Sequence, residues 1–219
     1  MNRKTAKAAL AVNLLIVLME IAGICMGFSN GAKMLVYYTV LSNLFALAAC
    51  ACYVLWAAGA LRAGDREPKP WITTLRYLST GCLTLTFLVV VLVFVPMALP
   101  YGGVDALLFK GVNLFHHLLC PVFSFVSFCF LEKGAPRSRR QNVLALIPTV
   151  IYAVVLVILN LMRVVRGPYP FLLVYEQPLW ASVLWAVVIL GAAYGVYFGL
   201  RKLQGRKSRE AAVSGAGRQ

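Results

Sequence analysis

Residues 74–99 read TLRYLSTGCLTLTFLVVVLVFVPMAL. This stretch decides the fold class because it is long and mostly apolar, with Arg76 as its only charged residue. A helix that crosses a bilayer needs ~20 mostly apolar residues. Six such runs are predicted, at residues 8–28, 34–61, 74–99, 107–131, 142–165 and 179–202. With 61% hydrophobic and 13% charged residues, the chain is expected to be an all-α polytopic membrane protein with six transmembrane helices.

The basic residues are distributed unevenly between the two ends of the predicted spans. Three precede the first span, four surround the second loop, four surround the fourth loop and six lie at and beyond the end of the last span. Only four of the 21 remain for the other side. Lys and Arg are enriched in cytoplasmic loops, so both termini are predicted to be cytoplasmic. The net charge of +14 then reflects topology and contact with membrane lipids, and no nucleic-acid partner is expected.

The loops are too short for a second folded unit. We expect a six-helix transmembrane domain over residues 1–203 and a basic, disordered tail over residues 204–219. In the last span, Gly191, Gly195 and Gly199 recur at every fourth position. Small residues at this spacing let helices approach closely, and contact within the chain is favoured over contact between protomers. The oligomeric state is not determined by this pattern.

The cysteines and histidines give little support for a metal centre. All six cysteines lie inside apolar runs, where small apolar packing is expected rather than disulfide formation. The group His116, His117 and Cys120 is a poor match to the usual ligand sets of metal sites. We therefore expect neither a metal nor a cofactor.

Five polar side chains interrupt four different spans at a similar predicted depth. At a rise of ~1.5 Å per residue, they all fall within ~15 Å of the outer surface. Polar groups in a bilayer usually face the interior of a bundle or a cavity. An outward-facing polar pocket is therefore predicted, formed by Glu20, Thr39, Asn43, His117 and Asn160.

Proline in the fourth span adds to this prediction. Pro121 lacks the N–H that would bond the carbonyl four residues earlier, which is that of His117. We expect a kink and a freed acceptor beside the imidazole. A purely structural kink is the alternative, because neighbouring groups satisfy such carbonyls in membrane helices. Whether His116 or His117 faces the pocket stays open.

A hydroxyl and an imidazole at one depth suggest nucleophilic hydrolysis, in which a base takes the proton of the hydroxyl. Thr39 is the candidate nucleophile and His117 the candidate base. Glu20 could orient an imidazole, and Asn43 or Asn113 could supply donors to an oxyanion. Each asparagine could instead serve only as a hydrogen-bonding contact between helices.

The outer loop before the last span is rich in aromatic residues and proline. Tyr169 and Phe171 lie in the stretch Gly167 to Leu172, GPYPFL. Two interpretations are open: ordinary aromatic residues of the membrane interface, or a rim over the pocket.

Four motifs occur in an order that resembles a known family. They are Tyr37 to Asn43 (YYTVLSN), Leu75-Arg76, Asn113 with His117 and Pro121, and Tyr169 to Leu172 (YPFL). Together they resemble the bacterial Pr-six-Pr family of six-span membrane proteins over essentially all six spans. More distantly, the chain is similar to the eukaryotic androgen-induced and androgen-dependent regulator proteins.

The resemblance implies a bacterial plasma membrane location and, from the eukaryotic branch, hydrolysis of fatty acid esters of hydroxy fatty acids by an intramembrane threonine and histidine. By motif these correspond to Thr39 and His117, although Pro121 follows His117 by four residues where the eukaryotic pattern has five. Two other functions stay open. The polar layer could carry a small molecule or protons without catalysis, or the chain could be a structural partner subunit.

Overall fold

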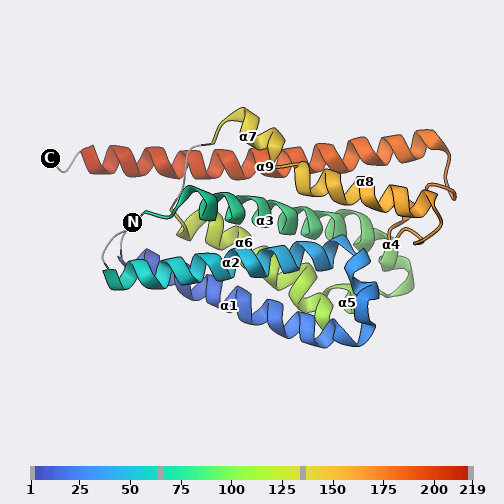
Figure 1. The fold of residues 1–219 in the computed structure, drawn as a ribbon, viewed down its shortest axis with the longest axis horizontal. Helices are drawn as coiled ribbons and strands as arrows, with labels where there is room; N and C mark the ends of the chain where they lie inside the picture. Colours follow the sequence, from blue (N-terminus) through green and yellow to red (C-terminus); the bar gives the residue numbers. More distant parts are fainter. Residues whose placement is uncertain (1–2, 64–66, 134–136, 217–219) are drawn as a thin grey trace.

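The computed structural model describes residues 3–63, 67–133 and 137–216, and the regular elements within these ranges are all helical. Six stretches there are long and apolar enough to cross a membrane: Arg3–Gly27, Tyr38–Ala63, Pro70–Tyr101, Leu114–Leu131, Arg139–Leu161 and Leu179–Arg206. The predicted all-α fold with six apolar spans is confirmed. Successive spans run in opposite directions along the bundle, and both termini lie at the same end of the bundle (Figure 1).

Several spans are built from more than one helical element. The first two are α1 (Arg3–Gly27) and α2 (Tyr38–Ala63), joined by η1 (Phe28–Val36). The third comprises α3 (Pro70–Val89), the π-helical η2 (Val90–Phe94), α4 (Val95–Ala98) and η3 (Leu99–Tyr101). After the short α5 (Val104–Leu108), the fourth comprises the π-helical η4 (Leu114–Leu119), α6 (Cys120–Val126) and the π-helical η5 (Ser127–Leu131). The fifth comprises α7 (Arg139–Leu144) and α8 (Ile147–Leu161), followed by η6 (Pro170–Leu172) and α9 (Leu179–Ala216).

Span boundaries differ from the sequence prediction by several residues, and two of these differences have a clear cause in the backbone. The fourth span begins at Leu114 rather than at residue 107, because the chain turns at Gly111, whose φ of 54° favours glycine. Asn113, expected inside the span, is therefore the residue that precedes η4. The fifth span ends at Leu161 rather than at residue 165, and the helix ends there because Arg163 has a left-handed φ of 58°.

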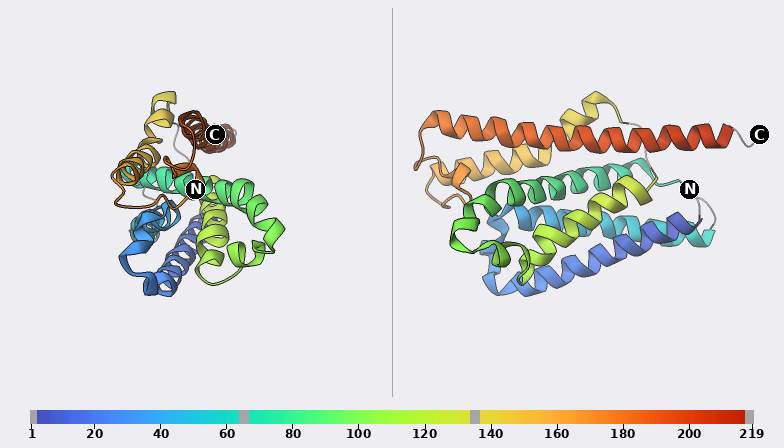
Figure 2. Two further views of the ribbon diagram at one scale, coloured as in Figure 1. Left: turned by 90° about the vertical axis from the view of Figure 1, so that its right-hand side faces the viewer. Right: turned by 180° about the vertical axis from the view of Figure 1, so that it is seen from behind.

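The third span occupies the middle of the bundle. α1 and α2 lie side by side and α2 packs against α3, while α6 packs against both α3 and α1. On the other side α3 contacts α9 and α8 (Figures 1 and 2). Segments of the second, fourth, fifth and sixth spans therefore meet around α3.

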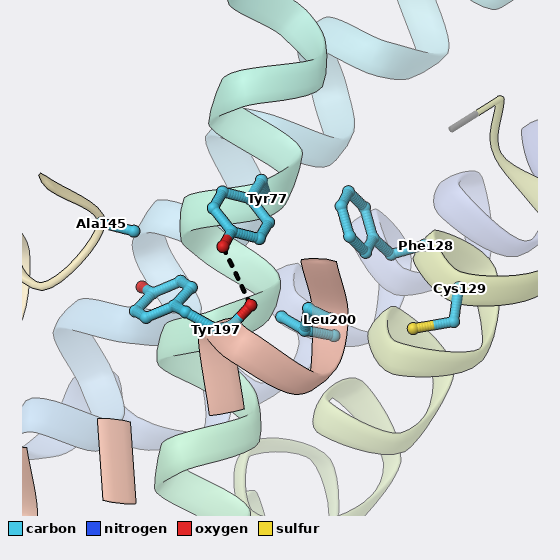
Figure 3. Close-up of a cluster of buried hydrophobic side chains, with 6 residues drawn as sticks. All are labelled: Tyr77, Phe128, Cys129, Ala145, Tyr197 and Leu200. Atoms are coloured by element: carbon cyan, nitrogen blue, oxygen red, sulfur yellow. Dashed lines mark hydrogen bonds between the residues drawn. The ribbon is translucent and has the colours of Figure 1, made fainter. Parts of the chain in front are cut away.

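The crossing of α3 and α9 shows why the two helices approach so closely. The Tyr77 hydroxyl donates to the Tyr197 carbonyl at 3.0 Å, within a cluster that includes Phe128 (Figure 3). A Cβ on Gly81 would lie 1.9 Å from the ring of Tyr197. Glycine is thus required at residue 81 for α9 to contact α3 as it does.

The glycine stripe of α9 does not make the internal contact that we expected. A Cβ at Gly191, Gly195 or Gly199 would meet no heavy atom within 4 Å among the described residues. The prediction of close packing within the chain is therefore wrong. The face of α9 that is buried in the bundle is the opposite one, which carries Ala193 and Tyr197.

The boundary expected at residue 204 falls within a packed helix. α9 continues past this residue to Ala216. Gln204 is 2% exposed and donates from its amide to the carbonyl of Phe128 at 2.6 Å. At this residue the chain is still part of the bundle.

Candidate functional site

A cavity of about 510 Å³ lies between the first, second and fourth spans, at the end of the bundle opposite the termini. Its lining includes Thr39, Asn113, His116, His117 and Tyr169. These side chains come from three separate parts of the sequence, and the tertiary structure brings them to one space. The polar layer therefore converges in part.

Thr39 lies in the first turn of α2, where backbone N–H groups have no helical acceptor. Its N–H donates to the Tyr169 hydroxyl at 3.4 Å, and the N–H of Tyr38 donates to the Tyr152 hydroxyl at 3.2 Å. The positive end of the α2 dipole thus points toward the cavity. Burial raises the pKa of Tyr169, against the effect of its hydrogen bonds with Thr39, so its phenol stays protonated at neutral pH.

His117 is oriented by a backbone group. Its Nδ1 lies 2.8 Å from the carbonyl oxygen of Leu107. A carbonyl can only accept, so Nδ1 carries the proton and Nε2 of the neutral ring keeps a free lone pair. This is the form that a general base requires. Among the described residues no hydrogen bond joins His117 to Thr39, although both line the cavity.

His116 also lines the cavity, so both neighbouring histidines face it. Its Nε2 lies 3.5 Å from Oε2 of Glu20, whose side chain is 0% exposed. A Cβ on Gly23 would lie 2.5 Å from the same Nε2. Glycine at this position of α1 lets the imidazole lie against the helix, and His116 lines the cavity whereas Glu20 does not. Glu20 thus lies beside His116 rather than His117, and no hydrogen bond to either carboxyl oxygen is found among the described residues.

Asn43 links α2 to η4 rather than lining the cavity. Its Nδ2 donates to the carbonyl of Thr39 at 2.7 Å and to that of His116 at 3.3 Å. Both N–H bonds are used, so Asn43 is not a donor to an oxyanion, contrary to the expectation. The segment holding His116 is π-helical, with bonds between residues five apart. The carbonyl freed by Pro121 is therefore that of His116, not His117, and Asn43 satisfies it.

Asn160 does not join the cavity. It lies at the last turn of α8, donates to the carbonyl of Val165 at 3.2 Å and accepts from the N–H of Val174 at 3.3 Å. It therefore holds together the two sides of the loop that follows. The span ends four residues earlier than expected, which explains why Asn160 reaches loop backbone instead of the bundle interior.

A second, apolar cavity of about 140 Å³ lies between α2, the third span, α8 and α9. Phe171 lines it, and Thr39, Phe94 and Tyr169 line both cavities. The rings of Phe94, Tyr169 and Phe171 stack at centroid distances of 5.1 to 6.5 Å. The aromatic loop is therefore a wall of the site. Thr39 lies where a polar space and an apolar space meet.

Sequence reasoning missed a buried ion pair in the half of the bundle nearer the termini. Arg76 is fully buried, and its guanidinium donates to Glu132 at 2.8 and 3.0 Å. Asn13 and Ser127 also donate to Glu132, at 3.1 and 3.0 Å. Arg76 lies near the start of the predicted third span and Glu132 directly after the fourth, and both were considered only as charges at span ends. The signal available was Arg76 inside an otherwise uncharged apolar run.

No family model, no curated protein and no solved structure matches the chain.

Proposed function

We propose that this integral membrane protein hydrolyses esters of lipids, with Thr39 as nucleophile and His117 as base. The observation that carries the proposal is the position of Thr39, which lines both the polar and the apolar cavity. An ester whose acyl chain lies among apolar side chains would present its carbonyl at this junction. The polar cavity would hold the alcohol portion and water.

The proposed reaction proceeds in two steps. The Thr39 oxygen attacks the ester carbonyl carbon while its proton passes to Nε2 of His117, and the imidazolium then protonates the departing alkoxide. Water, deprotonated by His117, hydrolyses the acyl-threonine and releases the acid. The phenol of Tyr169, which accepts from the N–H of Thr39 and lines both cavities, would donate to the developing oxyanion.

The test uses purified protein, a fluorophosphonate probe and fatty-acid esters. Thr39→Ala and His117→Ala are each expected to reduce labelling and turnover by roughly a hundredfold or more, and Thr39→Ser should retain part of both. Thr84→Ala is the matched control, because the Thr84 hydroxyl donates to the Thr80 carbonyl of its own helix and, in the part of the chain that the structure describes, to no other group. Turnover that persists unchanged in both alanine variants would refute the hydrolase.

A carrier of protons or a small molecule is the second candidate, and the buried carboxyl group of Glu20, 3.5 Å from His116, is the observation in its favour. Buried carboxyl groups in spans are common in proton pathways. A proton-coupled carrier should lose transport in Glu20→Gln, whereas a hydrolase would only be slowed. A structural subunit would tolerate loss of Thr39 and His117 but not Gly195→Leu on the exposed face of α9.

The distribution of basic residues supports a finer location as part of the same proposal. Both termini would lie in the cytoplasm and the cavity would open toward the outer side of a bacterial plasma membrane. Cysteine labelling of single-cysteine variants in intact cells would test this orientation. Labelling of residue 202, but not of residue 110, by a membrane-impermeant reagent would contradict it.

A further inference from the structure

A separate polar pocket of about 290 Å³ lies in the loop between α8 and α9. Two arginines, Arg163 and Arg166, line it, together with Asn160, Tyr175 and Glu176. It shares no lining residue with either cavity described above. The pocket is thus lined by two guanidinium groups and one carboxylate, and it has no role in the proposed hydrolysis.

The backbone at Arg163 is unusual for its residue type. The N–H of Arg163 bonds the carbonyl of Asn160 at 2.9 Å, and the N–H of Val164 bonds that of Leu159 at 3.0 Å. These two bonds form the helix ending in which the left-handed residue is usually glycine. Arg163 has a φ of 58°, where a Cβ crowds the backbone. Glycine would end the helix with less backbone strain, so the presence of an arginine side chain at this position needs another explanation.

The side chain of Arg163 is held in place by an aromatic ring. Its guanidinium carbon lies 5.0 Å from the ring centroid of Tyr175, and the Tyr175 hydroxyl donates to the carbonyl of Leu161 at 2.6 Å. No carboxylate pairs with Arg163 among the described residues, whereas Arg166 pairs with Glu176 at 2.8 Å. A stacked guanidinium keeps its N–H groups available, and its planar fork matches the oxygens of a phosphate.

The location favours a lipid as the source of that phosphate. The pocket lies between the end of one span and the start of the next, where lipid headgroups are found. Exposed apolar side chains flank it, including Met162 at 67%, Val164 at 64% and Trp180 at 70%. Tryptophan is enriched at this level of the membrane.

We infer that Arg163, stacked on Tyr175 beside Arg166, binds the phosphate group of a phospholipid at this end of the bundle. Glu176 competes with the phosphate for Arg166, so phosphate binding depends mainly on Arg163. The inference is independent of the proposed hydrolysis.

Native mass spectrometry of the full chain in detergent tests the inference with two lipids of identical acyl chains. Phosphatidylglycerol carries the phosphate and diacylglycerol does not, and wild type is expected to retain only the former. Arg163→Gly should weaken phosphatidylglycerol binding about tenfold, which is the factor given by one lost charge-assisted contact. Glu176→Gln should tighten binding, because Arg166 is then free.

Arg163→Gly is a sharp variant because glycine suits the local backbone, so the fold is expected to persist with an unchanged or higher thermal midpoint. Lys110→Gln is the matched control: it removes an exposed cation at the same end, paired with Asp105 outside the pocket. Equal losses in both variants, or wild-type binding by Arg163→Gly, would overturn the inference. Binding of inorganic phosphate but not of the lipid, lost in Arg163→Gly, would assign the site to a free phosphate.

Discussion

The buried ion pair between Arg76 and Glu132 gives the sharpest test of how the bundle is held together. The side chains are 0% and 4% exposed, and Arg76 donates to both carboxylate oxygens, at 2.8 to 3.3 Å. Arg76→Met removes these bonds and leaves a buried carboxylate that has lost its guanidinium but still accepts from Asn13 and Ser127. Removing one partner of a buried pair costs ~3–5 kcal/mol, so a loss of that size in the free energy of unfolding is expected.

The double variant separates the interaction between Arg76 and Glu132 from the contacts that each side chain makes with its other neighbours. Arg76→Met with Glu132→Leu removes both charges of the pair, and apolar replacements of buried pairs are often neutral. We therefore expect the double variant to recover at least ~2 kcal/mol relative to the sum of the single losses. The measurement is reversible unfolding in mixed micelles for the complete cycle. Arg62→Met is the control, since exposed Arg62 at the end of α2 should change stability by no more than ~0.5 kcal/mol.

Two results would contradict this account. A cost below ~1 kcal/mol for Arg76→Met would show that the pair contributes little to stability. Strict additivity in the double variant would show that the two side chains act independently despite their distance of 2.8 Å.

Substitution by alanine should be costly at the tightly packed Gly81 and harmless at Gly195 in the glycine stripe of α9. Gly81→Ala places a Cβ 1.9 Å from the ring of Tyr197, so a loss of ~1–3 kcal/mol or more in the free energy of unfolding is expected in the same assay. Gly195→Ala meets nothing within 4 Å and should be neutral or stabilising by up to ~1 kcal/mol, and a loss as large as that of Gly81→Ala would contradict the assigned faces of α9. Gly23→Ala should displace His116, whose Nε2 would lie 2.5 Å from the new Cβ, and lower ester turnover, while normal turnover would show that the Glu20–His116 contact is dispensable.

The helical class and the number of spans could be predicted from the sequence because each depends on local composition. An apolar run of ~20 residues must satisfy its own backbone hydrogen bonds in lipid, and a helix does this without help from the rest of the chain. The turn at Gly111 and the helix end at Arg163 were not predicted. Each depends on one residue adopting a left-handed backbone, for which the composition of the span gives no clear signal.

Which polar residues meet was decided only by the tertiary structure. Depth along a helix can be counted from the sequence, and Thr39 and His117 do line one cavity, but rotation about each helix axis is set by packing. Packing placed Glu20 beside His116, directed the Asn43 amide to backbone carbonyls and brought Asn160 into contact with loop backbone. The physical reason is that a polar side chain in a bilayer takes the partner within hydrogen-bonding reach, and that reach is fixed by neighbouring helices far away in the sequence.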